Sequence, residues 1–130
     1  MRSGTKQPTL ELLAGARDAE GLSDVLPLLE RLIASYNRNV VAQLIGVDRA
    51  QVTRWTSGQA PISAEMSARI LGLHSVIVRA HQVFTPQNVP GWLFGHSGFL
   101  GGARPIDALV VSGPGVVLEA LDAHEDGIYS

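Results

Sequence analysis

The chain has 130 residues, enough for one compact domain or two small subdomains, and its 45% hydrophobic but only 5% aromatic content favours an aliphatic, helical interior. It contains no cysteine, which excludes disulfide bonds and thiolate metal sites. The net charge is −2, but residues 1–58 carry seven Arg/Lys and six Asp/Glu, whereas residues 59–130 carry three and six, so the more basic part comes first. No apolar run approaches the roughly 20 residues that cross a bilayer. The polar start also predicts no secretory leader, and we expect a cytoplasmic protein without membrane contact.

The N-terminal part predicts two helices after a polar start. The first is expected from Thr9 to Ala19 and is ended by Gly21. Ser23 is the expected N-cap of the second helix, and Asn39 is the expected cap of the helix that follows. Apolar residues recur at helical spacing along the second helix: Val25, Leu29, Leu32, Ile33 and Tyr36.

Residues 39–58 form a short, dense unit. A helix of barely two turns ends at a turn around Gly46, where a positive φ is expected. Asp48 is expected to cap a second helix that runs to Thr56 and is stopped by Gly58. Val52 and Trp55 are expected to face inward, and Ala42 is the small residue that lets the two helices cross closely. Two short helices joined by a glycine-containing turn are typical of a helix-turn-helix, but they also occur as plain helix packing without DNA contact.

The longest predicted helix follows, starting at Pro61 or Ser63 and ending before Pro86. His74 and His81 share one of its faces, but no acidic residue lies one turn from either, so we expect no metal site. The apolar spacing favours an internal core stripe, although such a helix could also form a dimer seam. The stripe comprises Ile62, Met66, Ile70, Leu73, Ile77, Ala80 and Phe84.

After a loop predicted at residues 87–90, a glycine-rich stretch runs from Trp92 to Leu109. Pro105 starts a helix with Ile106, Leu109 and Val110 expected inward. A last helix is expected over residues 116–124, with Val117, Ala120 and Leu121 inward, followed by an acidic and then apolar tail. His96 and Ser97 are adjacent, but no orienting group follows them, and the chain holds no cluster of nucleophile, base and orienter. An enzyme is therefore not expected.

The first of these units resembles the Xre-type helix-turn-helix of bacterial regulators. The resemblance is carried by Ala42, by the turn from Gly46 to Asp48, and by Val52, Trp55 and Gly58. In that family the second helix lies in the DNA major groove. The resemblance therefore implies that base edges and phosphates are contacted by Arg49, Ala50, Gln51, Thr53 and Arg54. With only two basic side chains on this helix, useful affinity would need a dimer or a larger assembly.

The second half resembles the toxin-binding domain of Xre/MbcA/ParS-type antitoxins. The matching pattern comprises Trp92-Leu93, Leu100-Gly101-Gly102, Pro105, Leu109, Gly113, Val117, Leu121 and Gly127. Such antitoxins neutralise a RES-domain toxin that consumes NAD⁺, and their C-terminal end approaches the toxin's active site. The resemblance implies that the toxin is contacted by Phe99 and Arg104 and by the tail residues Glu125, Asp126, Gly127, Ile128, Tyr129 and Ser130.

Together these features predict an all-α protein: an N-terminal helix-turn-helix bundle, a long connecting helix and a small C-terminal toxin-binding module. The expected division is an N-terminal segment at residues 1–22, the helix-turn-helix at 23–60 and the toxin-binding domain at 61–130. The expected partners are the cognate RES-domain toxin and operator DNA, in a homodimer or a hetero-oligomer with the toxin, and no cofactor is expected. The alternative is a helix-turn-helix transcriptional regulator whose C-terminal half only dimerises, or an adaptor that never binds DNA.

Overall fold

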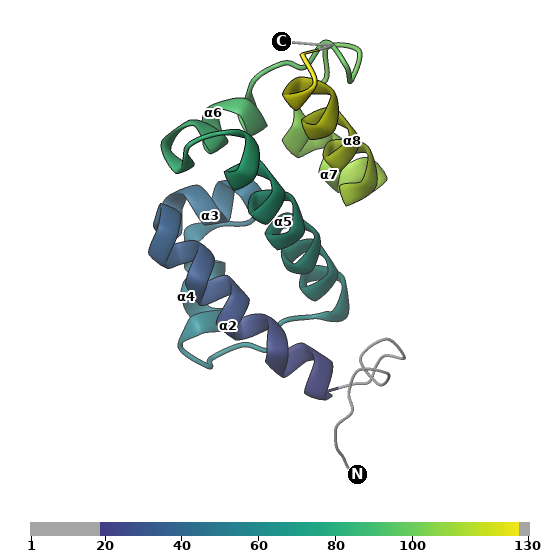
Figure 1. The fold of residues 1–130 in the computed structure, drawn as a ribbon. Coiled ribbons are helices and arrows are strands. Elements are labelled where there is room, and N and C mark those ends of the chain that lie inside the picture. The colour runs from purple at the N-terminus through teal and green to yellow at the C-terminus, as the bar shows by residue number, and fades with distance from the viewer. Residues whose placement is uncertain (1–18, 128–130) are drawn as a thin grey trace. The chain divides into compact units, whose positions relative to one another are not determined.

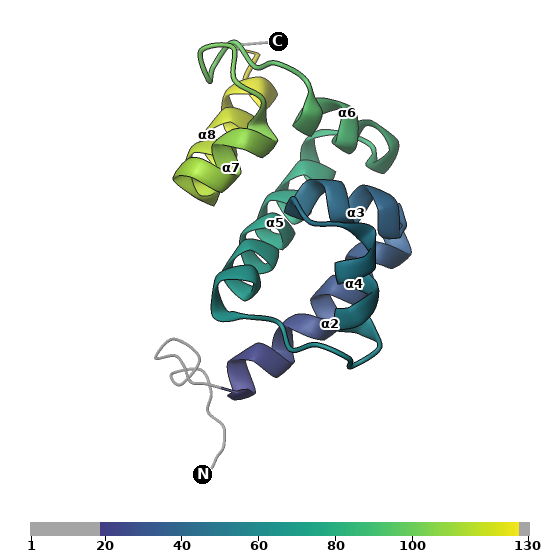
Figure 2. The same cartoon turned by 180° about the vertical axis from the view of Figure 1, so that it is seen from behind.

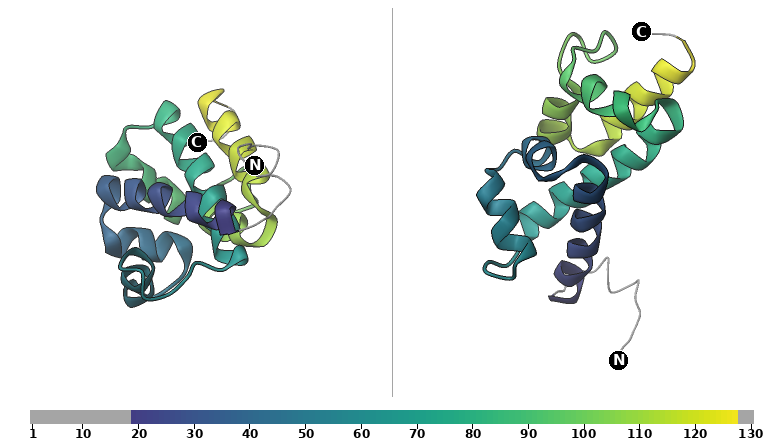
Figure 3. Two further views of the ribbon diagram at one scale, coloured as in Figure 1. Left: turned by 90° about the horizontal axis from the view of Figure 1, so that it is seen from below. Right: turned by 90° about the vertical axis from the view of Figure 1, so that its left-hand side faces the viewer.

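The computed structural model describes residues 19–127, and over this range all regular secondary structure is helical (Figure 1). For these residues the expectation of an all-α fold is confirmed. Figures 2 and 3 show the same helices from further sides. The elements in chain order are α2 (Ala19–Tyr36), α3 (Arg38–Ile45), α4 (Arg49–Thr56), α5 (Ala64–Val83), the 3₁₀ turn η1 (Pro86–Asn88), α6 (Val89–Phe94), α7 (Pro105–Ser112) and α8 (Pro114–Glu125).

The described residues divide into two compact units. The first unit holds residues 19–43 and 47–70, and the second holds residues 44–46 and 71–127. The long helix α5 belongs to both, because the division falls between Ile70 and Leu71.

The start of the first unit differs from the prediction. Helix α2 already includes Ala19 and continues through Gly21 and Ser23, so Gly21 ends no helix and Ser23 is not an N-cap. A glycine inside a helix costs only about 1 kcal/mol relative to alanine, which tertiary packing readily offsets. The short helix predicted from Thr9 lies almost wholly outside the described residues.

Asn37 lies between α2 and α3. The cap of α3 is this residue and not Asn39, which the sequence predicted. Its φ of 77° is in the left-handed region, which asparagine tolerates better than most residues. Its backbone N–H donates to the carbonyl oxygen of Ile33 at 2.7 Å, which closes α2. Its side-chain Oδ1 accepts from the backbone N–H of Val40 at 3.0 Å, which caps α3. A single residue therefore ends one helix and starts the next.

The boundaries of α4 agree with the sequence prediction. Gly46 has the expected positive φ of 89°, and Asp48 occupies the N-cap position with extended backbone angles, but its side chain forms no capping hydrogen bond. At the other end Gly58 has a φ of 83° and donates to the carbonyl of Trp55 at 3.3 Å, while the N–H of Gln59 donates to the carbonyl of Arg54 at 2.9 Å. This pair of bonds is a Schellman motif, which needs a left-handed residue where Gly58 stands.

The core of the first unit is aliphatic apart from one tryptophan. Val52 and Trp55 of α4 are buried, as expected, and so is the small Ala42 of α3. Ser63 is the N-cap of α5, because its Oγ accepts from the backbone N–H of Met66 at 3.1 Å. Other buried apolar residues of this unit are Val25, Leu29, Leu32, Val41, Ile62 and Ile70.

The second unit packs α6, α7 and α8 with the second part of α5. The predicted loop at residues 87–90 is wrong: a 3₁₀ turn leads into α6, with Pro90 in its first turn, where proline's missing N–H costs nothing. Leu93 is fully buried in α6, while Trp92 is half-buried and packs on Phe84 with ring centroids 5.7 Å apart. Phe84 also packs on His124 of α8, at 4.7 Å between ring centroids.

Helices α7 and α8 join at Gly113, whose φ of 86° turns the chain between them. The last helix is longer than predicted and includes Glu125. The inward position predicted for Val110 is wrong, since 46% of its surface is exposed. The buried face of α7 is made by Pro105, Ile106 and Leu109, which leaves Val110 on the outside. Val117, Ala120 and Leu121 of α8 are buried as predicted.

Candidate functional site

The predicted DNA-contacting residues lie on the surface of α4. Arg49, Ala50, Thr53 and Arg54 are exposed, and Gln51 is half-buried. This follows from the helical period, because Val52 and Trp55 occupy the buried face. The outward face of the helix is thus polar and basic.

The side chains on this face interact with each other. The guanidinium of Arg54 donates a hydrogen bond through Nη2 to Oε1 of Gln51 at 2.7 Å, one helical turn away. Helices α3 and α4 with the turn between them carry three arginines, Arg38, Arg49 and Arg54, against the single acid Asp48. This local excess of positive charge is absent from the chain as a whole, whose net charge is −2. The arrangement suits contact with an anionic surface.

The glycine-rich loop at residues 95–104 is closed by its own hydrogen bonds. The N–H of Gly102 donates to the carbonyl of Ser97 at 2.8 Å, and the N–H of Ser97 donates to the carbonyl of Ala103 at 3.0 Å. His96 donates from Nδ1 to the carbonyl of Gly102 at 2.7 Å, since that oxygen can only accept. Gly101 and Gly102 have positive φ values of 69° and 92°. His96 and Ser97 therefore serve the loop's shape.

Two predicted toxin contacts come from this loop and its exit. Phe99 is at the loop's tip, with 37% of its surface exposed. Arg104 is the N-cap residue of α7. Its guanidinium donates two hydrogen bonds to the carboxylate of Asp107, from Nε at 2.8 Å and from Nη2 at 3.1 Å. The hydrogen bond and charge of Arg104 hold the pKa of Asp107 below its ordinary value.

The predicted acidic tail is partly helix. Glu125 is the last residue of α8, and together with Asp122 it forms an ion pair with Arg79 of α5. These hydrogen bonds raise the pKa of Arg79, with Glu125 the larger contributor. Asp126 is the exposed C-cap residue, and Gly127 follows with a φ of 78°. The other predicted contacts, Ile128, Tyr129 and Ser130, lie outside the described residues.

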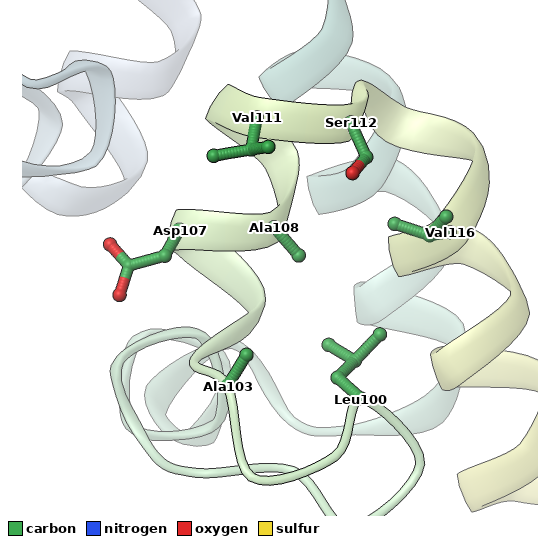
Figure 4. Close-up of a pocket in the computed structure, with 7 residues that line it drawn as sticks. All are labelled: Leu100, Ala103, Asp107, Ala108, Val111, Ser112 and Val116. Carbon is green, nitrogen blue, oxygen red and sulfur yellow. The ribbon is translucent and has the colours of Figure 1, made fainter.

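An exposed apolar surface on α7 was missed by the sequence reasoning. Val111 is 83% exposed, beside Val110 at 46%. An open depression of about 370 Å³ lies next to it. Leu100, Ala108 and Val116 point into this depression, while the carboxylate of Asp107 points away (Figure 4). The available signal was the run Leu109-Val110-Val111, since a helix can bury only one side of three consecutive apolar residues.

Within residues 19–127, no three His, Asp or Glu side chains gather closely enough to hold a metal ion. No helix in the same range is long and apolar enough to cross a membrane. Comparison with protein-family models, with curated proteins and with solved structures finds no match to the chain.

Proposed function

We propose that this chain is an antitoxin of a type II toxin–antitoxin system, which binds and neutralises a RES-domain NAD⁺-degrading toxin. It also represses its own operon through an Xre-like helix-turn-helix over residues 23–60. The observation that carries the proposal is the order of two patterns in one chain. The pattern around Gly46, Trp55 and Gly58 is followed by the tryptophan-leucine, leucine-glycine-glycine and proline-helix pattern from Trp92 onward.

The geometry of α3 and α4 supports the DNA-binding part. Both helices have eight residues, and the turn between them contains a glycine with positive φ. The first turn of α4 exposes Arg49, whose guanidinium can read guanine, and it carries the half-buried Gln51, a residue type that can read adenine. Thr53 and Arg54 are exposed further along, where they suit phosphate contacts.

The second unit supports the toxin-binding part. Its exposed features are an aromatic side chain at Phe99, an apolar surface at Val110 and Val111, and acidic groups at Glu119 and Asp126. A site that binds NAD⁺ must hold phosphates with basic groups, so an acidic partner surface complements its rim. The second unit is therefore suited to a protein partner with a basic binding site.

The direct test measures NAD⁺ consumption by a RES-domain protein, which the antitoxin function predicts to be encoded beside this gene. Adding the purified chain at saturating concentration is expected to stop the NAD⁺ loss. A chain lacking residues 128–130 is the matched variant, and it is expected to fold normally but to inhibit less. Full toxin activity in the presence of the intact chain would refute the antitoxin function. Full neutralisation by the shortened chain would remove the tail from the inhibitory contact.

One observation favours the alternative, a regulator whose C-terminal half only dimerises. Leu71 and Val78 are seven residues apart on α5, and both are substantially exposed, at 45% and 48%. This spacing places them on one helix face, as in a coiled-coil seam. Under this alternative, Leu71→Glu would turn a dimer into a monomer in light scattering, and the RES-domain protein would not bind.

A further inference from the structure

The most exposed apolar feature of the described residues is the valine surface, defined here as Val110, Val111 and the adjoining depression. Its walls are aliphatic or small, and Asp107 at its edge is neutralised by Arg104. Burying apolar area is favourable by about 25 cal/mol per Å², so a valine left 83% exposed forgoes stabilisation that a covering surface would supply. The depression could receive a side chain of a covering partner. It is lined by Leu100, Ala103, Asp107, Ala108, Val111, Ser112 and Val116.

The unit that carries the valine surface has an excess of acidic residues. Residues 71–127 contain two arginines and five Asp/Glu. Both arginines are engaged by acids, Arg79 with Asp122 and Glu125 and Arg104 with Asp107. Two exposed acids of α8 form no ion pair within the described residues, and one of them, Glu119, lies one helical turn beyond Val116 of the depression. The other is Asp126, at the far end of the same helix.

This charge distinguishes between the possible occupants. In a two-fold dimer the same patch meets itself, so a second copy would bring the acids of α8 near their own counterparts. Like charges brought together at an interface are unfavourable, whereas a basic partner would gain from the same arrangement. The pattern therefore fits a different protein better than another copy of this chain.

We infer that the valine surface is the docking site for a partner segment that carries an aliphatic side chain flanked by lysine or arginine. The aliphatic side chain fills the depression against Val111 and Val116, and the basic side chains lie over Glu119 on α8. This inference rests on the proposed function, because it identifies the partner as the RES-domain toxin. Under this inference the main contact with the toxin is made by α7 and not by the C-terminal tail.

The test is calorimetric titration of the purified RES-domain protein into the full chain and its variants. Val111→Asp places a charge where an apolar side chain must dock, and it is expected to weaken binding by about 100-fold, the scale of a central interface residue. Ala68→Asp is the matched control, because Ala68 is an exposed apolar residue of α5 that does not line the depression. It is expected to bind like the wild type. Circular dichroism and thermal melts verify that both variants are folded.

A second variant tests the charge. Glu119→Lys is expected to slow association by about tenfold at low salt, with the difference shrinking as salt is added. Wild-type affinity of Val111→Asp would overturn the docking site while leaving the antitoxin function intact. Failure of the unmodified chain to bind the toxin would overturn both. A wild-type dimer that Val111→Asp converts to monomer, with toxin affinity unchanged, would assign the surface to a second copy and overturn the inference.

Discussion

Helices α4 and α7 have the same length but opposite exposed chemistry. Each has eight residues and buries two or three of them, Val52 and Trp55 in α4 and Pro105, Ile106 and Leu109 in α7. The remaining surface of α4 carries arginine, threonine and glutamine, whereas that of α7 carries two valines beside Asp107 and Ser112. A polar, basic helix suits a hydrated anionic partner, and a valine surface suits a protein that excludes water. The two helices therefore expose surfaces that suit different kinds of partner.

The largest expected effect tests whether the two units have separate cores. Trp55→Ala removes a side chain that is only 4% exposed, and it should lower the free energy of unfolding of the first unit by about 3–5 kcal/mol. The second unit holds the chain's other tryptophan, Trp92, whose fluorescence reports on it alone in this variant. Urea unfolding followed by circular dichroism should shift more than unfolding followed by Trp92. Equal shifts in both signals would show one shared cooperative unit.

The next prediction concerns the basic surface of α4. Arg49→Ala should weaken binding to the chain's own promoter by about 1–3 kcal/mol and relax sequence preference, if the guanidinium contacts a base. Arg31→Ala is the control, because it removes the same charge from an exposed position of α2. Gel shift or anisotropy at low salt measures both. Equal losses of DNA affinity in the two variants would show that α4 contributes only nonspecific positive charge to DNA binding.

A smaller effect is expected at the junction before α3. Asn37→Ala loses the cap to Val40 and places a Cβ-bearing residue without a capping side chain at a φ of 77°. Each of these terms costs on the order of 1 kcal/mol. Asn37→Gly keeps the positive φ without strain and should cost only a few tenths. Thermal melts that rank the two variants in the reverse order would contradict the account of Asn37.

The smallest effect is the pH dependence of the ion pair beside the valine surface. Because Arg104 lowers the pKa of Asp107 in the folded state, the pair contributes stability above the ordinary carboxyl pKa of 3.8. That contribution is lost as the pH falls below 3.8 through the folded-state pKa. The melting temperature of Asp107→Asn should therefore be below that of the wild type at neutral pH and converge with it in acid. A constant difference across pH 2–7 would exclude this linkage.

Local chemistry predicted those parts of the fold that one residue decides. The positive φ at Gly46 and the inward pair Val52 and Trp55 are confirmed, and of the two starts expected for α5, Pro61 or Ser63, the structure has Ser63 as the cap. Each follows from a strong preference, either of backbone sterics or of helical period. The all-helical class follows from the same periodicity.

The predictions failed where two local signals competed. Asn37 and Asn39 are equally good caps by composition, and the choice depends on which one the end of α2 places in the left-handed region. The prediction of a loop at residues 87–90 was wrong because a proline such as Pro90 can stand in the first turn of a helix as well as follow the end of one. Val110 was predicted inward together with Ile106 and Leu109, but the buried face of α7 is formed by Pro105, Ile106 and Leu109 and leaves Val110 exposed.

The candidate contact residues could be predicted from the sequence only where the sequence predicts which side chains are exposed. The outward face of α4 follows once its buried pair is known. By contrast, the ion pair of Glu125 with Arg79 joins residues 46 positions apart, and no local pattern encodes such a meeting. The depression between the loop and α7–α8 is likewise a product of tertiary packing, so it could not be read from the order of residues.

The self-closed loop at residues 95–104 has a thermodynamic consequence. Its amides at Ser97 and Gly102 are already bonded within the loop, so Phe99 is carried on a backbone that has little conformational freedom to lose. Ordering a flexible segment on association costs about 1–2 kcal/mol for each residue fixed. A partner that contacts Phe99 avoids most of this entropic penalty, because the loop's ordering accompanied the folding of the chain.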